Sequence, residues 1–259
     1  MKVAIIGAGN MGGATARGIA KGTLVSTNEI AISNPSRGKL ESIKTDFPDI
    51  AITQDNRECV KGADLVILAV KPWKLKEVID EIRDFLTPHT ILCSMAGGIG
   101  IQKIEEILGD ATRPIYYIIP NTAIAVRQSM TFIASKNSTN EMDQQILHIF
   151  QELGDAMLVE ERLMGAGMAL ASCGIAYAMR YIRAATEGGV ELGMYARDAQ
   201  RIVQQTLRGA VELLEATKGH PEEEIDKVTT PGGITIRGLN AMEQNGFSNS
   251  VIQGLKASK

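Results

Sequence analysis

The 259-residue sequence has few aromatic residues, few cysteines and no excess of basic charge. Aromatic residues make up 4% of the chain, and the formal net charge is -3. Nucleic-acid binding uses stacking side chains and clustered Lys and Arg, so we expect no nucleic-acid partner. The three cysteines (Cys59, Cys93 and Cys173) are far apart and odd in number. This pattern favours buried thiols in a reducing compartment, with neither a disulfide nor a metal site.

Long hydrophobic runs are also scarce. Residues 163–179 are uncharged and lie between Arg162 and Arg180. This stretch is shorter than the ~20 residues that span a bilayer, and it is rich in Gly, Ala and Ser. We interpret it as a closely packed internal or intersubunit helix. The N-terminus leads straight into an apolar segment without the pattern of a signal peptide. We therefore expect a cytoplasmic protein with no membrane partner.

In the first 160 residues, short apolar segments alternate with amphipathic ones. The apolar segments have the β-branched, nearly continuous pattern of strands buried on both faces of a parallel sheet. They cover residues 3–7, 30–33, 65–70, 91–95 and 115–119. Helical patterns lie near residues 11–21, 36–46, 73–86 and 101–108. Two later runs, 131–135 and 156–159, could extend the sheet at its edge. The alternation predicts an α/β fold with a Rossmann-like, doubly wound sheet over residues 1–160.

The pattern changes after residue 160, where no further strand signal is found. Apolar residues at 203, 207, 210, 211 and 214 form one helical stripe. We predict an all-helical second domain over residues 161–259.

A glycine-rich motif follows the first predicted strand and opens the first predicted helix. Gly7-Ala8-Gly9-Asn10-Met11-Gly12 matches G-x-G-x-x-G. The first glycine permits a tight turn, the second lets the backbone approach a pyrophosphate, and the third allows close helix–strand packing. The helix N-terminus supplies amides and a positive dipole. The strand, motif and helix together predict dinucleotide binding at Gly7, Gly9, Asn10, Met11 and Gly12.

The end of the second predicted strand distinguishes the two nicotinamide cofactors. NAD sites usually place Asp or Glu there to bind the ribose 2′-hydroxyl. This chain has Ser33, Asn34, Ser36 and Arg37 around Pro35 and no carboxylate. These side chains suit a 2′-phosphate, with Arg37 as its cation, so NADPH is favoured over NADH. The alternative is an ordinary turn with a solvated Arg37.

Two further segments end at the same edge of the sheet, where open α/β sheets bind ligands. Further cofactor contacts are therefore predicted at Ala69, Val70, Lys71, Pro72, Ala96 and Gly97. Lys71 could be a catalytic amine, a cation near the cofactor, or a solvated turn residue.

Hydroxyacid dehydrogenases need a general base, commonly His or Lys. The three histidines (His89, His148 and His220) are not near a predicted strand end or a glycine-rich stretch. No lysine is present between residues 137 and 217. Relatives of 3-hydroxyisobutyrate dehydrogenase resemble this architecture, but their catalytic lysine on an early helix of the second domain has no counterpart here. A cyclic imine, protonated to an iminium, needs only orientation and a hydrogen bond to the ring nitrogen.

Motifs along the whole chain resemble the pyrroline-5-carboxylate reductase family. They are I-I-G-A-G-N-M-G at the start, Asp55-Asn56, A-D-L-V-I-L-A-V-K-P (63–72), I-P-N-T (119–122), A-Y (176–177), H-P (220–221), V-T-T-P-G-G-I-T-I-R-G-L (228–239) and E-Q-N-G-F (243–247). The resemblance implies NADPH-dependent reduction of L-1-pyrroline-5-carboxylate to L-proline. It also implies a helical domain that interlocks with its twin in a homodimer, and in some members a decamer of five dimers.

The same resemblance implies that residues 229–235 are the substrate loop. Its members are Thr229, Thr230, Gly232, Gly233, Ile234 and Thr235. Backbone amides at the start of the following helix would hold the substrate carboxylate. Thr235 would lie near the ring nitrogen as the catalytic contact. Asn56, Pro120 and Asn121 would lie along the cofactor.

The chain departs from the family pattern in two places. The family usually has M-P-N-T-P-A where this chain has Ile119-Pro120-Asn121-Thr122-Ala123-Ile124, and G-S-G-P-A-Y where it has S-C-G-I-A-Y (172–177). Two alternatives therefore remain open. One is reduction of another cyclic imino acid, and the other is a non-catalytic NADP(H)-binding sensor.

Overall fold

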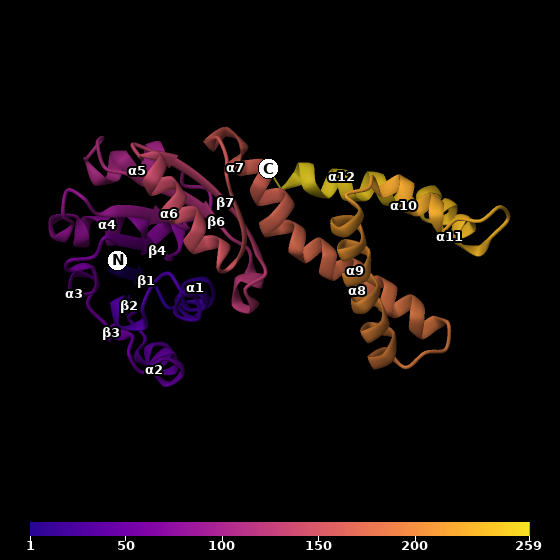
Figure 1. Ribbon diagram of the computed structural model, residues 1–259, viewed down its shortest axis with the longest axis horizontal. Helices are drawn as coiled ribbons and strands as arrows, with labels where there is room; N and C mark the ends of the chain where they lie inside the picture. The colour runs from indigo at the N-terminus through magenta and orange to yellow at the C-terminus, as the bar shows by residue number, and fades with distance from the viewer. Residues whose placement is uncertain (259) are drawn as a thin grey trace. The chain divides into compact units, whose positions relative to one another are not determined.

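The computed structural model describes residues 1–258, which form two compact units, residues 1–172 and 173–258. The first unit contains one eight-stranded sheet in the order β3-β2-β1-β4-β5-β6-β7-β8 (Figure 1). The strands are β1 (Val3–Ile6), β2 (Ile30–Ser33), β3 (Ala51–Thr53), β4 (Leu65–Leu68), β5 (Ile91–Ser94), β6 (Ile115–Ile119), β7 (Ser129–Lys136) and β8 (Gly154–Leu158). β7 runs antiparallel to β6, and all other neighbours are parallel. The predicted doubly wound α/β fold is confirmed.

Two hydrophobic cores lie on opposite faces of this sheet, because successive strand residues point to opposite sides. Val3 and Ile5 of β1 belong to one core, and Ala4 and Ile6 to the other. The first core includes α1 (Asn10–Ala20), α2 (Arg37–Asp46) and α6 (Asn140–Gln151). The second includes α3 (Asn56–Val60), α4 (Leu75–Ile82), α5 (Ile101–Leu108) and α7 (Met164–Gly167). The carboxyl ends of β1 to β6 therefore meet at one edge between two helical layers.

β3 and α3 are absent from the sequence-based expectation. β3 has three residues, none of them fully buried, and α3 has five residues. Elements this short carry too few side chains for a periodic signal. α3 is defined by its N-cap, because the Asp55 carboxylate accepts a hydrogen bond from the Arg57 amide at 2.9 Å.

The stretch 163–179 also differs from the single helix expected there. α7 passes into a π-helix, Met168–Cys173, and then into α8 (Gly174–Glu191). At Gly167 an added Cβ would lie 2.5 Å from the ring of Phe132, so the absence of a side chain allows close packing on β7. The Asn121 amide donates to the Ala171 carbonyl at 3.4 Å, within the π-helix where the regular bonding pattern changes.

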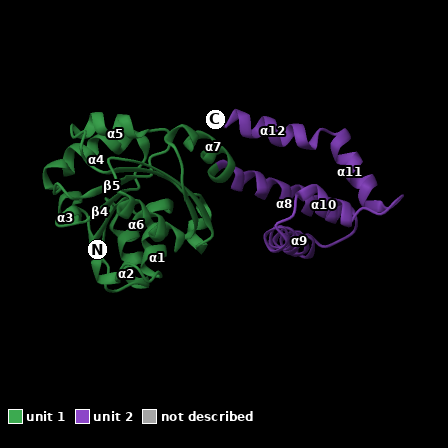
Figure 2. Ribbon diagram, turned by 45° about the horizontal axis from the view of Figure 1, so that its top comes forward, with its two compact units in different colours: residues 1–172 green, residues 173–259 purple. Residues whose placement is uncertain are grey.

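The second unit consists of helices over its described residues, 173–258 (Figure 2). They are α8, α9 (Ala196–Thr217), α10 (Pro221–Lys227), α11 (Ile234–Gln244) and α12 (Phe247–Ala257). Tyr181 of α8 packs edge-to-face on Phe247 of α12, with ring centroids 6.5 Å apart. Ala199 is the one fully buried hydrophobic side chain among these described residues. No helix within residues 1–258 is both long and apolar enough to cross a membrane.

Candidate functional site

A cavity of about 890 Å³ opens at the carboxyl edge of the sheet. Many of the residues expected to bind the cofactor line it: Gly7, Gly9, Asn10, Met11, Asn34, Asn56, Ala69, Val70, Lys71, Pro72 and Gly97. The lining also includes Lys39, Glu81, Met95 and Thr122, which were not expected. Expected residues outside the lining are Gly12, Ser33, Ser36, Arg37, Ala96, Pro120 and Asn121.

The glycine motif has the geometry that its three glycines require. Gly7 has φ +104°, and a Cβ there would lie 2.7 Å from the Ala69 carbonyl oxygen. A Cβ on Gly12 would overlap the Gly7 carbonyl oxygen and lie 2.8 Å from the Ala69 Cβ. A Cβ on Gly9 would meet nothing within 4 Å, and Gly9 lines the cavity. Gly7 and Gly12 therefore allow β1, β4 and α1 to approach, whereas Gly9 leaves open space beside the helix N-terminus.

The segment after β2 is held against the glycine motif. The Asn34 carboxamide oxygen accepts a hydrogen bond from the Ala8 amide at 3.0 Å, and its NH₂ donates to the Ser36 carbonyl at 3.2 Å. Arg37 instead pairs with Glu41, Nε to Oε1 at 3.0 Å, and its side chain is 77% exposed. Lys39, two residues further along α2, is the cation of this segment that lines the cavity.

Ser33 positions the Asn56 side chain by a hydrogen bond. Its side chain is fully buried, and its hydroxyl donates to the Asn56 Oδ1 at 2.7 Å. That bond orients the Asn56 NH₂, which donates to Glu81 Oε2 at 2.7 Å. A carboxylate from α4 is thereby held at the cavity beside the end of β3.

The glycine-rich turn after β5 is fixed by two distant side chains. The Tyr117 hydroxyl accepts a hydrogen bond from the Gly98 amide at 2.9 Å. Glu161 Oε1 accepts one from the Ile101 amide at 2.7 Å, at the start of α5. Burial raises the pKa of Tyr117, so its phenol stays protonated. Gly97, the cavity-lining residue of this turn, is therefore held in place by a buried tyrosine.

Asn121 is engaged by the protein itself. Its Oδ1 accepts from the Ala123 amide at 2.9 Å, and its NH₂ donates to Ala171. Its own amide donates to the Ser129 hydroxyl at 3.0 Å. Pro120 and Asn121 are buried, and the neighbouring Thr122 reaches the cavity. The I-P-N-T motif signalled this position, although the exposed member is Thr122.

The T-T-P-G-G-I-T loop leads into α11, as expected. Gly232 has φ +71°, and Gly233 is the N-cap of α11 with no side-chain capping bond. The first turn of α11 contains no acidic residue. Thr229 donates to the Ile225 and Asp226 carbonyls, both at 3.1 Å, which ties the loop to α10. Thr230 and Thr235 are exposed. The Gly233 amide donates to the Thr230 carbonyl at 2.9 Å, so the loop presents the next amides, at the start of α11, and two hydroxyls.

Other nucleophilic or metal-binding groups are few. Burial raises the pKa of Cys59 to about 11 and that of Cys93 well above its usual value. Both therefore remain thiols at neutral pH, which makes them poor nucleophiles. Within residues 1–258, no group of three or more His, Cys, Asp or Glu side chains could hold a metal ion.

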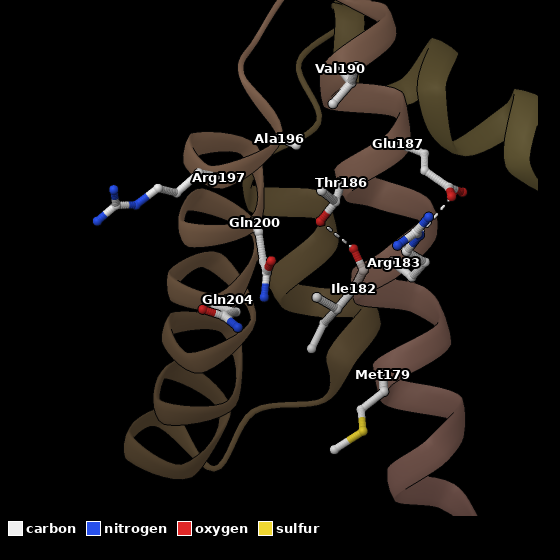
Figure 3. A pocket seen from close by; sticks show the side chains of 10 residues that line it. All are labelled: Met179, Ile182, Arg183, Thr186, Glu187, Val190, Ala196, Arg197, Gln200 and Gln204. Carbon is white, nitrogen blue, oxygen red and sulfur yellow. Dashed lines mark hydrogen bonds and ion pairs between the residues drawn. The ribbon is translucent and has the colours of Figure 1, made fainter.

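A groove of about 870 Å³ lies between α8 and α9 in the helical unit (Figure 3). α8 contributes apolar side chains, Met179, Ile182 and Val190, and α9 contributes Gln200 and Gln204. The ion pair between Arg183 and Glu187, at 2.7 Å, lies along its α8 wall. The groove belongs to a unit with almost no buried core, so it is apolar surface that a partner could cover.

Two family models match the chain in sequence order. Residues 2–98 match NADP oxidoreductase coenzyme F420-dependent, and residues 161–259 match pyrroline-5-carboxylate reductase dimerisation. Pyrroline-5-carboxylate reductase 2 of Dictyostelium discoideum is 38% identical over 98% of this chain and 89% of its own length.

Solved structures agree over the whole chain. A pyrroline-5-carboxylate reductase from Coxiella burnetii is 30% identical, with a TM-score of 0.91, over 99% of this chain and 95% of that one. The pyrroline carboxylate reductase of Plasmodium falciparum, solved with NADP bound, is 27% identical, with a TM-score of 0.89, over 100% and 95% of the two chains. The matches extend through both units, and the chain belongs to the pyrroline-5-carboxylate reductase family.

Proposed function

We propose that this protein reduces L-1-pyrroline-5-carboxylate to L-proline with NADPH, the last step of proline biosynthesis. The observation that carries the proposal is the coexistence, in one family member, of an open dinucleotide cavity and an uncapped T-T-P-G-G-I-T loop. The cavity fits a dinucleotide, because it follows a glycine motif with open space at Gly9. NADPH, when bound, supplies the hydride that adds to the carbon of the C=N bond.

The chain's own residues orient the two reactants. The Gly9–Met11 segment and the N-terminus of α1 would hold the pyrophosphate. The turn at Gly97, fixed by Tyr117, would support the nicotinamide half of the cofactor. This turn follows β5, whereas the adenosine half would lie at the end of β2, and β1 and β4 separate these two strands in the sheet. The oriented dinucleotide lowers the entropic cost of bringing donor and acceptor carbons together.

The loop before α11 would bind the substrate. The amides of the first turn of α11 are the donors for its carboxylate, and Gly233 leaves them without a competing side chain. Thr235 would hydrogen-bond the ring nitrogen, which gains the electron pair of the C=N bond as hydride adds to carbon. Thr229 holds the loop to α10 and plays a positioning role.

Self-association completes the proposal. The family match at residues 161–259 is to a dimerisation domain, so we place the start of that domain at residue 161. Leu192, Tyr195 and Ile234 are 87%, 84% and 80% exposed in the single chain. A homodimer would cover apolar surface of this kind, and a decamer of five dimers is the larger assembly in this proposal. We place the protein in the cytoplasm.

Purified protein tests this directly. NADPH oxidation is measured with pyrroline-5-carboxylate, with the six-membered piperideine analogue, and with NADH in place of NADPH. Fast, NADPH-preferring turnover of the five-membered imine is the expected result. Preference for the analogue would identify another cyclic imino acid as substrate, and cofactor binding without turnover would identify a sensor.

Thr235→Ala isolates the ring-nitrogen contact. An unmet hydrogen bond costs about 1–3 kcal/mol, so kcat should fall roughly 10- to 100-fold. NADPH affinity should stay within about two-fold. Thr45→Ala, whose hydroxyl bonds only the Glu41 carbonyl on α2, is the matched control. An unchanged kcat in Thr235→Ala would remove this residue from the mechanism.

A further inference from the structure

We propose that Lys39, rather than Arg37, is the cation that meets the 2′-phosphate of NADPH and sets the preference for it over NADH. The inference rests on the proposed function only in taking a nicotinamide dinucleotide as the ligand. Lys39 lies at one end of the cavity in the first unit.

The sheet order identifies that end. Gly7 follows β1 in the middle of the sheet, Asn34 follows β2, and Asn56 follows β3 at the edge. In a Rossmann-like sheet the pyrophosphate lies at the glycine motif, and the adenosine ribose lies at the end of the second strand. The part of the cavity lined by Asn34, Pro35, Lys39 and Asn56 is therefore its adenosine end.

Arg37 is engaged elsewhere. It is the first residue of α2, and its guanidinium pairs with Glu41 one turn later at 3.0 Å. The side chain is 77% exposed and does not line the cavity. An anion near this pair meets a cation and a carboxylate together, and the two fields largely cancel beyond the pair.

Lys39 lacks such a partner. Lys39 is exposed, makes no ion pair with a carboxylate among residues 1–258, and lines the cavity beside Pro35. The start of α2 adds to the same field. Its N-cap, Ser36, makes no side-chain capping bond, so the first amides of this ten-residue helix remain available to bind an anion.

The other charged residues that line the cavity leave Lys39 as the cation available to a phosphate at the adenosine end. Lys74 pairs with Glu77 at 2.7 Å, and Lys71 follows β4, on the opposite side of β1 from β2. Glu81, held by the Asn56 amide, brings a negative charge to the adenosine end. A carboxylate there suits a ribose hydroxyl and repels a phosphate. Lys39 is the cation placed to offset it.

The test compares variants of the full-length protein by calorimetry, with 2′,5′-ADP and 5′-ADP as probes. Lys39→Gln should lower affinity for 2′,5′-ADP about 10-fold and leave 5′-ADP within about two-fold. Arg37→Gln should change either affinity less than about three-fold, and Lys39→Arg should restore 2′,5′-ADP binding. Lys76→Gln, which removes an exposed α4 lysine paired with Asp80, is the matched control. In turnover, Lys39→Gln should lower the ratio of NADPH to NADH kcat/KM by the same factor.

Two results would overturn the assignment. One is a larger loss of 2′,5′-ADP affinity in Arg37→Gln than in Lys39→Gln. The other is wild-type protein that binds 5′-ADP as tightly as 2′,5′-ADP. Failure of the proposed function looks different, because 2′,5′-ADP binding would remain Lys39-dependent while no pyrroline-5-carboxylate is reduced.

Discussion

Gly9 and Gly12 belong to one motif, yet alanine at each should fail in a different way. A Cβ at residue 12 overlaps the Gly7 carbonyl oxygen, and the Ala69 Cβ is 2.8 Å away. Gly7 and Ala69 directly follow β1 and β4, and neither atom can move away by a side-chain rotation. Overpacking of this kind costs about 3 kcal/mol. Alanine recovers about 1 kcal/mol of helix propensity. The net loss is about 2 kcal/mol, or roughly 4–8 °C in Tm for a unit of this size.

Alanine at residue 9 meets nothing within 4 Å, and the backbone there is extended (φ -72°, ψ -170°). Stability should change by only about 0.5 kcal/mol, mainly from a slightly poorer N-cap. The added methyl projects where a pyrophosphate would approach the α1 amides. NADPH affinity should therefore fall about 10-fold or more, equal to at least ~1.4 kcal/mol.

Thermal unfolding and calorimetric NADPH titration of Gly9→Ala and Gly12→Ala separate the two effects. Gly9→Ala should keep its Tm and lose affinity, whereas Gly12→Ala should lose Tm. If Gly9→Ala binds NADPH like the wild type, the cofactor does not lie against this loop. If Gly12→Ala keeps its Tm, the close approach of α1 to β1 is not what Gly12 provides.

Two further changes test the supports of the cavity. Tyr117→Phe removes the acceptor of the Gly98 amide, which costs about 1 kcal/mol. The KM for NADPH should therefore rise about five-fold, with a smaller effect on kcat. Steady-state kinetics at saturating imine measures both, and an unchanged KM would mean that the turn needs no anchor. The side-chain hydrogen bond from Arg57 lowers the pKa of Asp55 to about 2 from its usual 3.8. A depressed pKa means that this carboxylate stabilises the fold above about pH 4 and stops doing so as pH falls through 2. In Asp55→Asn the free energy of unfolding should therefore depend less on pH in that window. Identical acid-unfolding curves for both proteins would show that the Asp55–Arg57 pair does not contribute to stability.

The fold was readable from sequence because its signals are local. Residues 3–7 and 65–70 are continuous apolar segments, and the glycine motif joins a strand to a helix within a few residues. The second helix of the Rossmann unit begins at Arg37, next to the predicted residue 36. Such features depend on neighbours in the chain, which sequence periodicity reports directly.

The site was less readable because its details depend on distant contacts. The Tyr117 hydroxyl binds an amide 19 residues away, and Ser33 bonds Asn56, 23 residues away. Nothing local marks Ser33 as buried or shows that Lys39 reaches the cavity, although the Arg37–Glu41 pair is an i,i+4 contact that the helical spacing itself suggests. Residue type identified a segment that lines the cavity, but which of its residues reach the cavity depends on tertiary packing.

The two units also differ in whether each can account for its own stability. The first unit has two cores of buried strand and helix residues. In the second, Ala199 is the one fully buried hydrophobic among residues 173–258, while Leu192, Tyr195 and Ile234 are more than three-quarters exposed. Helices without a core are marginal in water, so the helical unit should depend on the dimer that its family match indicates.

Dilution should therefore separate cofactor binding from turnover. If the dimer supports α10 and α11, the proposed substrate loop between them should lose that support as the protein falls below its dimer dissociation constant, and specific activity should fall with the dimer fraction. NADPH affinity, which depends on the first unit, should change less than about two-fold. Sedimentation velocity gives the dimer fraction at each concentration, and activity and cofactor fluorescence are measured on the same samples. A monomer that keeps full specific activity would show that one chain supports the loop by itself.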